Sequence, residues 1–140
     1  MISRWSTILV TLFFIATPSY ARNVTELPSH MTKIILDESW NGKTIELKTG
    51  DEIQIELRGT GGTGYTWHFD ELDNDYLQLI GEGRKVQEKS EELVGSSTLY
   101  YWILKAKKIG KSVLKMNYYR IWEGRDKAIR RFEVEMDIIP

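Results

Sequence analysis

The chain has 140 residues, no cysteine and a net charge of −1, so its length fits one domain whose core must be stable without disulfides. The absence of cysteine excludes thiol catalysis, iron–sulfur clusters and cysteine-based zinc sites. The balanced charge, with no stripe of Lys or Arg, argues against a nucleic acid partner. We therefore expect no cofactor, no metal ion and no nucleic acid.

The first 21 residues have the pattern of a secretory signal peptide. Arg4 supplies a positive start, residues 8–16 are apolar, and Ser19 and Ala21 are the small residues that a signal peptidase reads. The apolar stretch is shorter than the roughly 20 residues that a membrane-spanning helix needs, which disfavours the alternative of an uncleaved anchor. The sequence predicts cleavage after Ala21 and export to the periplasm or the medium. Residues 22–140 would then form a single β-sandwich domain without membrane attachment.

Short alternating segments predict β-strands in the first half of that domain. Residues 43–48 and 52–58 alternate polar and apolar side chains on either side of a turn at 49–51. A period of two residues is typical of half-buried strands. We expect strands, in chain order, at 31–36, 43–48, 52–58, 65–69 and 76–80, the last of them ended by Gly81-Glu82-Gly83, and a strand or a loop at 85–91.

Three longer alternations follow, at 99–107, 112–119 and 128–138, and none of the sequence shows a helical apolar stripe. About seven or eight short strands with frequent turns favour an all-β, antiparallel β-sandwich. One face of the first strand carries Tyr100, Trp102, Leu104 and Ala106, and one face of the last carries Phe132, Val134, Met136 and Ile138. The middle strand has Val113, Lys115, Asn117 and Tyr119 on one side and Leu114, Met116 and Tyr118 on the other.

Loops at one end of a sandwich can form one binding surface, and the glycine-rich segment 59–64 is the first candidate. Its four glycines allow positive φ and close approach of the backbone to a partner, so we interpret them as loop residues and not as packing residues. A phosphate-binding loop is disfavoured because no helix and no lysine follow. A mobile hairpin turn remains the alternative to a recognition loop.

Two further segments complete this set of candidate loops. Residues 94–98 are small and polar, a composition that also fits an ordinary turn. Residues 120–125 place Trp122 among charged residues and next to a glycine. An exposed tryptophan in a loop favours a role in binding, because it offers a large contact area at low entropic cost. The alternative is a tryptophan folded over the end of the sandwich, with Arg120 stacked against it.

Taken together, the three loops resemble those of the chagasin-like inhibitors of papain-family cysteine proteases. That family carries Asn-Pro-Thr-Thr-Gly-Tyr/Phe followed by Trp, then Gly-x-Gly-Gly, then Arg-Pro-Trp. The residues that match the first motif are Thr63, Gly64, Tyr65 and Trp67. Residues 95–98 lie where the second motif is expected, and Arg120 and Trp122 match the third. The departures are Thr60-Gly61-Gly62 for Asn-Pro-Thr, Ser97-Thr98 for two glycines, and Ile121 for proline.

The resemblance implies an immunoglobulin-like fold and reversible, non-covalent inhibition of a papain-family protease by a monomer. The first loop would lie over the catalytic cysteine of the enzyme, and the other two would hold the cleft on either side. Replacing proline by glycine makes a loop less rigid, so affinity or preferred protease can differ from the rest of the family. The residues expected to bind the protease are Thr60, Gly61, Gly62, Thr63, Gly64, Tyr65, Gly95, Ser96, Ser97, Thr98, Arg120, Ile121, Trp122 and Glu123.

Two other functions remain open from the residues alone. An exported β-sandwich that binds carbohydrate or a surface protein is one, because Tyr65 and Trp122 would also suit a sugar-binding platform. An enzyme is disfavoured, because neither His30 nor His68 has a serine and a carboxylate in a recognisable triad pattern. Acidic residues beside the turns fit solvation better than paired catalytic carboxylates or a calcium loop.

Overall fold

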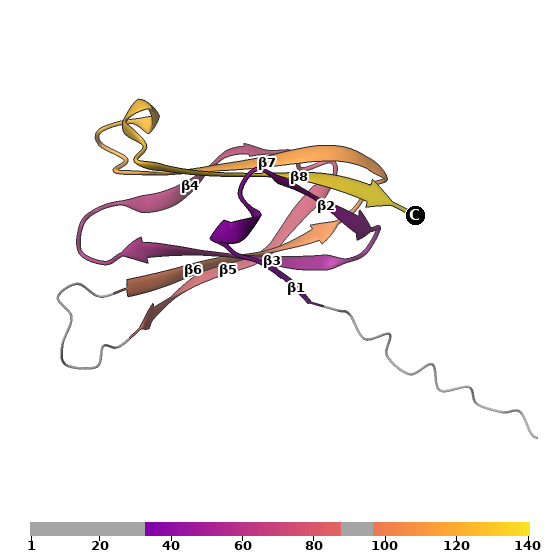
Figure 1. Cartoon of the computed structure of the whole chain (residues 1–140), viewed down its shortest axis with the longest axis horizontal. Coiled ribbons are helices and arrows are strands. Elements are labelled where there is room, and N and C mark those ends of the chain that lie inside the picture. Colours follow the sequence, from indigo (N-terminus) through magenta and orange to yellow (C-terminus); the bar gives the residue numbers. More distant parts are fainter. Residues whose placement is uncertain (1–32, 88–96) are drawn as a thin grey trace, which may run out of the picture.

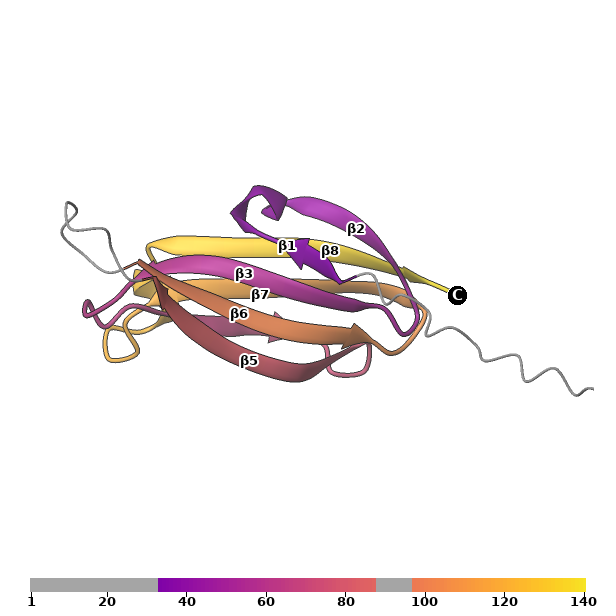
Figure 2. The same ribbon diagram turned by 90° about the horizontal axis from the view of Figure 1, so that it is seen from below.

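The computed structural model describes residues 33–87 and 97–140, which form two four-stranded sheets packed face to face (Figures 1 and 2). Two short 3-10 turns, η1 (Glu38–Trp40) and η2 (Arg125–Lys127), interrupt the strands. The strands are β1 (Ile34–Leu36), β2 (Lys43–Lys48), β3 (Glu52–Thr60), β4 (Thr66–Leu72), β5 (Leu77–Gln87), β6 (Ser97–Ala106), β7 (Gly110–Tyr119) and β8 (Arg130–Ile139). The expected all-β sandwich is confirmed.

One sheet has the strand order β1-β3-β6-β5 and the other has the order β2-β8-β7-β4. The central pairs are antiparallel as expected, but β1 pairs with β3 and β2 pairs with β8 in parallel. The expectation of a purely antiparallel sandwich is therefore wrong at these two edges. The chain crosses from one sheet to the other through η1, so β1 and β2 do not form a hairpin, and no tight turn imposes an antiparallel pairing on them.

The core lies between the inner faces of the two sheets. The faces of β6 and β8 that the alternation groups together point inward, and in β7 the inward face is the one with Leu114, Met116 and Tyr118. Tyr100 is partly buried and the rest of these side chains are buried. Ile53, Ile55 and Leu57 of β3 supply the neighbouring positions, and Leu36 and Leu47 come from the two edge strands. Within the described residues, no helix is long and apolar enough to cross a membrane.

Strand β5 is longer than the sequence predicts, because it continues through Gly81 and Gly83 to Gln87. Large side chains of the neighbouring strand β6 cover these glycines. A Cβ at Gly83 would lie 2.6 Å from Cζ of Tyr101, and one at Gly81 would lie 3.5 Å from Ile103. Glycine weakens the interior of a strand, but here the cross-strand side chains need the space that it leaves. A bulge between Leu79 and Gly81 shifts the register by one residue, and the pairing with β6 continues beyond it.

Strand β3 also extends further, to Gly59 and Thr60, so the glycine-rich loop is shorter than expected. Gly59 is buried and pairs with Thr98 of β6. A Cβ at this position would lie 2.7 Å from the Tyr100 ring and 2.8 Å from the Tyr118 hydroxyl. The interpretation of all four glycines as loop residues is wrong at Gly59, because glycine is needed there for packing.

Candidate functional site

Strand register places three connections at one end of the sandwich. Thr60, which ends β3, pairs with Ser97, which begins β6, and Ser97 also pairs with Gln87, which ends β5. In the other sheet Thr66, which begins β4, pairs with Tyr119, which ends β7. The β3–β4, β5–β6 and β7–β8 connections therefore all start and finish at the same end. Figures 1 and 2 show the first and last of these opposite the C-terminus.

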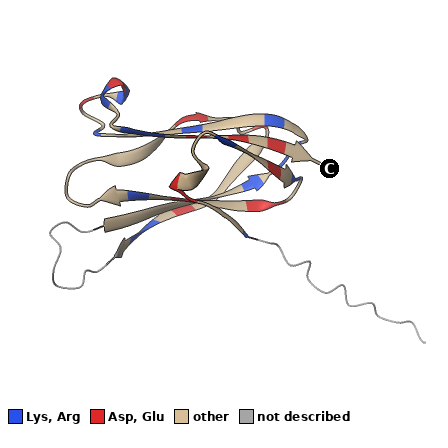
Figure 3. Ribbon diagram, in the orientation of Figure 1, with Lys and Arg blue, Asp and Glu red and all other residues tan. Residues whose placement is uncertain are grey.

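We name these connections the first loop (residues 61–65), the second loop (residues 88–96) and the third loop (residues 120–129). The first loop has no charged side chain, and its ribbon is tan in Figure 3. Gly62 and Gly64 have φ of 78° and 79°, a region in which side-chain-bearing residues are strained. The Thr63 hydroxyl donates to the Thr60 carbonyl at 2.9 Å and closes the turn.

Arg120 connects the third loop to the first. Its Nε donates to the Thr63 carbonyl at 2.8 Å, and its guanidinium carbon lies 4.5 Å from the centre of the Tyr65 ring. One terminal nitrogen also forms an ion pair with Glu123 at 3.1 Å. A guanidinium can stack on an aromatic face while its edge donates hydrogen bonds, which suits this arrangement. The two loops thus form one connected surface.

Trp122 is 68% exposed, and the neighbouring Ile121 is exposed as well. One part of the indole lies over Gly64, because a Cβ added there would overlap the ring and lie 2.9 Å from Cζ2. The guanidinium of Arg120 is 6.0 Å from the ring centre. The indole therefore contacts the first loop and is also exposed to solvent, while its role in binding stays a prediction.

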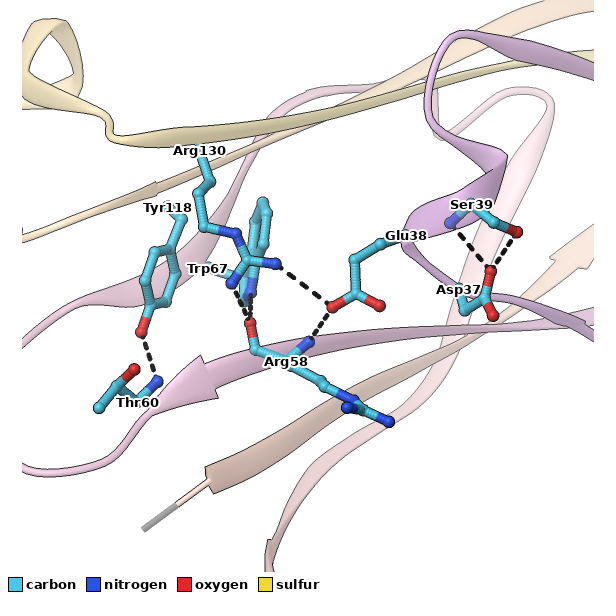
Figure 4. A network of polar contacts seen from close by, with 8 residues as sticks. All are labelled: Asp37, Glu38, Ser39, Arg58, Thr60, Trp67, Tyr118 and Arg130. Atoms are coloured by element: carbon cyan, nitrogen blue, oxygen red, sulfur yellow. Dashed lines mark hydrogen bonds and ion pairs between the residues drawn. The ribbon is translucent and has the colours of Figure 1, made fainter. Parts of the chain in front are cut away.

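The base of the first loop is fixed by aromatic side chains of the opposite sheet (Figure 4). The Tyr118 hydroxyl accepts a hydrogen bond from the Thr60 amide at 2.9 Å, and its ring stacks on Tyr65 at 5.5 Å. The indole nitrogen of Trp67 donates to the Arg58 carbonyl at 3.1 Å. Burial raises the pKa of Tyr100, whose ring lies beside Gly59, so this phenol remains neutral.

The second loop (residues 88–96) lies outside the residues that the structure describes. Gly95 and Ser96 lie outside the described residues. Ser97 and Thr98 were expected in this loop, but they begin strand β6, so that placement is wrong. Both residues pair with β3 and with β5, which extends the strand into the polar segment. Thr98 is only 4% exposed, which leaves its side chain unavailable to a partner.

Two exposed apolar residues at this end were missed by the sequence interpretation, Val86 near the end of β5 and Ile129 at the end of the third loop. Both are next to polar residues and outside a clear alternation of polar and apolar side chains. An isolated apolar residue of this kind is a sequence signal that could have identified them as exposed. Together with Ile121 and Trp122 they make this end of the sandwich rich in exposed apolar side chains. Large exposed apolar groups gathered in one region mark a binding surface.

Within residues 33–87 and 97–140, no group of three or more His, Asp or Glu side chains could hold a metal ion. The first loop presents backbone and hydroxyl groups, and the third loop presents an exposed indole, aliphatic side chains and the charged residues around η2. These features define a binding domain that recognises its partner through loops at one end of a β-sandwich.

The model of the family described as chagasin family peptidase inhibitor I42 matches residues 46–136. Amoebiasin-2 from Entamoeba histolytica is 30% identical over 96 residues, which cover 69% of this chain and 77% of that protein. Chagasin from Trypanosoma cruzi is 24% identical over 98 residues, which cover 67% of this chain and 87% of that protein. The chain belongs to the chagasin family of peptidase inhibitors.

The fold is also similar to a solved member of that group. The crystal structure of a cysteine protease inhibitor from Entamoeba histolytica superposes with a TM-score of 0.69 at 28% identity, covering 76% of this chain and 95% of that one. The resemblance noted from the three loop motifs is therefore confirmed at the level of family and fold. The carbohydrate-binding alternative is not favoured by these relatives.

Proposed function

We propose that the protein inhibits papain-family cysteine proteases reversibly and without a covalent bond, by occluding the active-site cleft with its loops. The observation that carries this proposal is the contact between the first and third loops. Arg120 and Trp122 hold the glycine-rich loop in one position and leave an exposed indole beside it. A loop that is ordered before binding loses less entropy on association.

The first loop is the part that would enter the cleft. From Thr60 to Gly64 no side chain is larger than threonine, so the loop is thin enough for a narrow groove. Its backbone amides and carbonyls would pair with those of the enzyme, as an extended peptide does. Resistance to cleavage follows if none of its carbonyls is held in the attack geometry that hydrolysis needs.

The third loop would supply the anchor, with Trp122 and Ile121 against an apolar wall of the cleft. Arg120 and Glu123 act differently from simple contact residues. The guanidinium already engages Thr63, Tyr65 and Glu123, so Arg120 orients the two loops and does not reach for an acidic rim on the enzyme. Gly95 and Ser96 of the second loop would contact the other side of the cleft.

We also propose that the chain is exported, with its signal segment removed near Ala21, and that it acts as a monomer without catalytic residues of its own. The support for export is the pattern of residues 1–21 alone. Expression with an epitope tag at the C-terminus, followed by N-terminal sequencing of the exported product, tests this part. A product that retains residues 1–21 would contradict it.

Titration of a panel of papain-family proteases with the purified protein tests the inhibitor function. We expect inhibition that competes with substrate, saturates at one protein per enzyme and disappears on dilution. A trypsin-type serine protease serves as the control and should be unaffected, because its cleft and nucleophile differ. Failure to inhibit any member of the panel at micromolar concentration would contradict the proposal.

A further inference from the structure

Arg130, the first residue of β8, bridges the two sheets directly beneath the first loop (Figure 4). One terminal nitrogen donates to the Arg58 carbonyl at 2.6 Å, and the other lies 3.3 Å from a carboxylate oxygen of Glu38. The guanidinium carbon also lies 5.1 Å from the centre of the Trp67 ring and 5.5 Å from that of Tyr118. No loop motif includes this arginine.

Both backbone groups of Arg58 are held by this arrangement. Its carbonyl accepts from Arg130 and from the Trp67 indole, and its amide donates to Glu38 at 2.6 Å. The same oxygen of Glu38 thus receives hydrogen bonds from the Arg58 amide and from Arg130. We refer to Glu38, Arg130 and the Arg58 backbone as the brace. It joins η1, β3 and β8 in one hydrogen-bonded unit.

The position of the brace along β3 gives it a consequence for the loop. Arg58 is two residues before Thr60, whose amide is held by Tyr118, and the first loop begins at the next residue. Any rotation of the β3 backbone at Arg58 would therefore tilt the first loop relative to the third. Arg120 and Trp122 hold the tip of the first loop, and the brace holds its base.

The charge pairing alone is a weak source of stability. The side chains of Arg130 and Glu38 are 39% and 38% exposed, and ion pairs at that exposure contribute little because solvent screens them. The planar guanidinium matters more, since it satisfies a carbonyl and a carboxylate at once while its face covers two aromatic rings. A lysine at this position would keep the positive charge but would not reproduce the geometry of the guanidinium.

We infer that Arg130 is a positioning residue for protease inhibition, which with Glu38 holds the base of the first loop in the orientation that enters the cleft. The inference rests on the proposed function for its effect on inhibition. A loop base released from the brace would populate several orientations, and only the competent fraction would bind. Apparent affinity falls by that fraction, and the loss appears in the association rate constant.

The test compares Arg130→Gln with Arg131→Gln, which removes the same charge from an exposed neighbour on the outer side of the strand. For Arg130→Gln we expect the association rate constant with a papain-family protease to fall by about tenfold, because only about one tenth of the molecules would hold the loop in the binding orientation. The dissociation rate constant should be nearly unchanged. Arg131→Gln should match the unmodified protein. Arg130→Lys should have an association rate constant between those of Arg130→Gln and Arg131→Gln. It replaces Arg130→Gln in the test if that variant folds poorly.

Hydrogen exchange gives a second measurement that needs no protease. The amides of Arg58 and Thr60 should exchange faster in Arg130→Gln than in Arg131→Gln at equal global stability. Unchanged exchange would overturn the inference, even if the protein inhibits nothing and the proposed function has failed. Faster dissociation with unchanged association would also overturn it, because Arg130 would then be a direct contact. Combining Arg130→Gln with Glu38→Gln should add little to the loss, since both belong to one unit.

Discussion

The indole of Trp122 lies against the α-carbon of Gly64, in the space that a Cβ at residue 64 would occupy. The two residues are 58 positions apart in the chain. Their contact turns two loops from different strand pairs into one surface, and Arg120 strengthens it through the Thr63 carbonyl. A mutation on either side of this contact should therefore affect the same binding surface.

Gly64→Ala should displace Trp122 and weaken inhibition. Gly62→Ala is the matched control, because Gly62 has nearly the same positive φ but only open space where a Cβ would lie. Each change strains the backbone by about 1–2 kcal/mol, since a left-handed conformation disfavours a side chain. We expect Gly64→Ala to lose clearly more inhibition than Gly62→Ala, with a shift in tryptophan fluorescence that the control lacks. Equal inhibition constants for the two variants would show that the Trp122–Gly64 contact does not matter for binding.

Trp122→Ala should raise the inhibition constant strongly without affecting the fold. A tryptophan at the centre of an interface contributes about 2 kcal/mol or more, equivalent to roughly 30-fold in affinity. The side chain is 68% exposed in the free protein, so the melting temperature should hardly change. Thermal denaturation and inhibition assays on the same preparation separate binding from packing. A lower melting temperature with unchanged inhibition would assign Trp122 to packing.

Thr63→Trp should abolish inhibition, because a bulky side chain on the tip of the first loop would block its insertion into a narrow cleft. Thr63→Ala should have a smaller effect, since it removes one hydroxyl that donates to the Thr60 carbonyl. A single hydrogen bond of this kind contributes about 1 kcal/mol. Comparable inhibition by the tryptophan variant and the unmodified protein would mean that the first loop stays outside the cleft.

Ser112→Ala should stabilise the protein, a test of the core that is independent of the loops. Among the described residues, the Ser112 hydroxyl oxygen is the buried side-chain polar atom without a hydrogen-bond partner. Removing an unsatisfied buried hydroxyl should raise the free energy of unfolding by about 1 kcal/mol. Ser39→Ala is the control and should lower the free energy of unfolding, because the Ser39 hydroxyl donates a hydrogen bond to Asp37. Urea denaturation measures both, and a destabilised Ser112→Ala variant would contradict the expectation.

Much of the fold could be predicted because alternation is a local signal. The sequence predicts strand β2 at its observed bounds, and its alternation groups the buried side chains of β6, β7 and β8 on one face of each strand. The errors arise where contact with a residue far away in the sequence determines the local structure. Gly83 stays within β5 because Tyr101 of the next strand covers it, and Gly59 stays within β3 because Tyr100 and Tyr118 fill the space beside it.

In the candidate site, too, local sequence features could be predicted and long-range contacts could not. The order of the loop motifs identified the family, but the contacts that organise the loops join residues far apart in the chain. Arg120 lies 57 residues from Thr63, and Arg130 lies 92 residues from Glu38. No spacing rule in a single sequence reveals such pairs, since strand register and sheet packing bring them together. The second loop was misjudged at Ser97 and Thr98 because polar residues can also begin a strand.

Protection of the catalytic cysteine of a papain-family protease tests the central claim most directly. A small thiol-alkylating reagent is added to the enzyme with and without saturating amounts of the protein, and the rate of modification is followed by mass spectrometry. Occlusion by the first loop predicts strong protection, followed by release of active enzyme and uncleaved protein on dilution. Modification at the rate of the free enzyme would contradict the account, because the cleft would then be open in the complex.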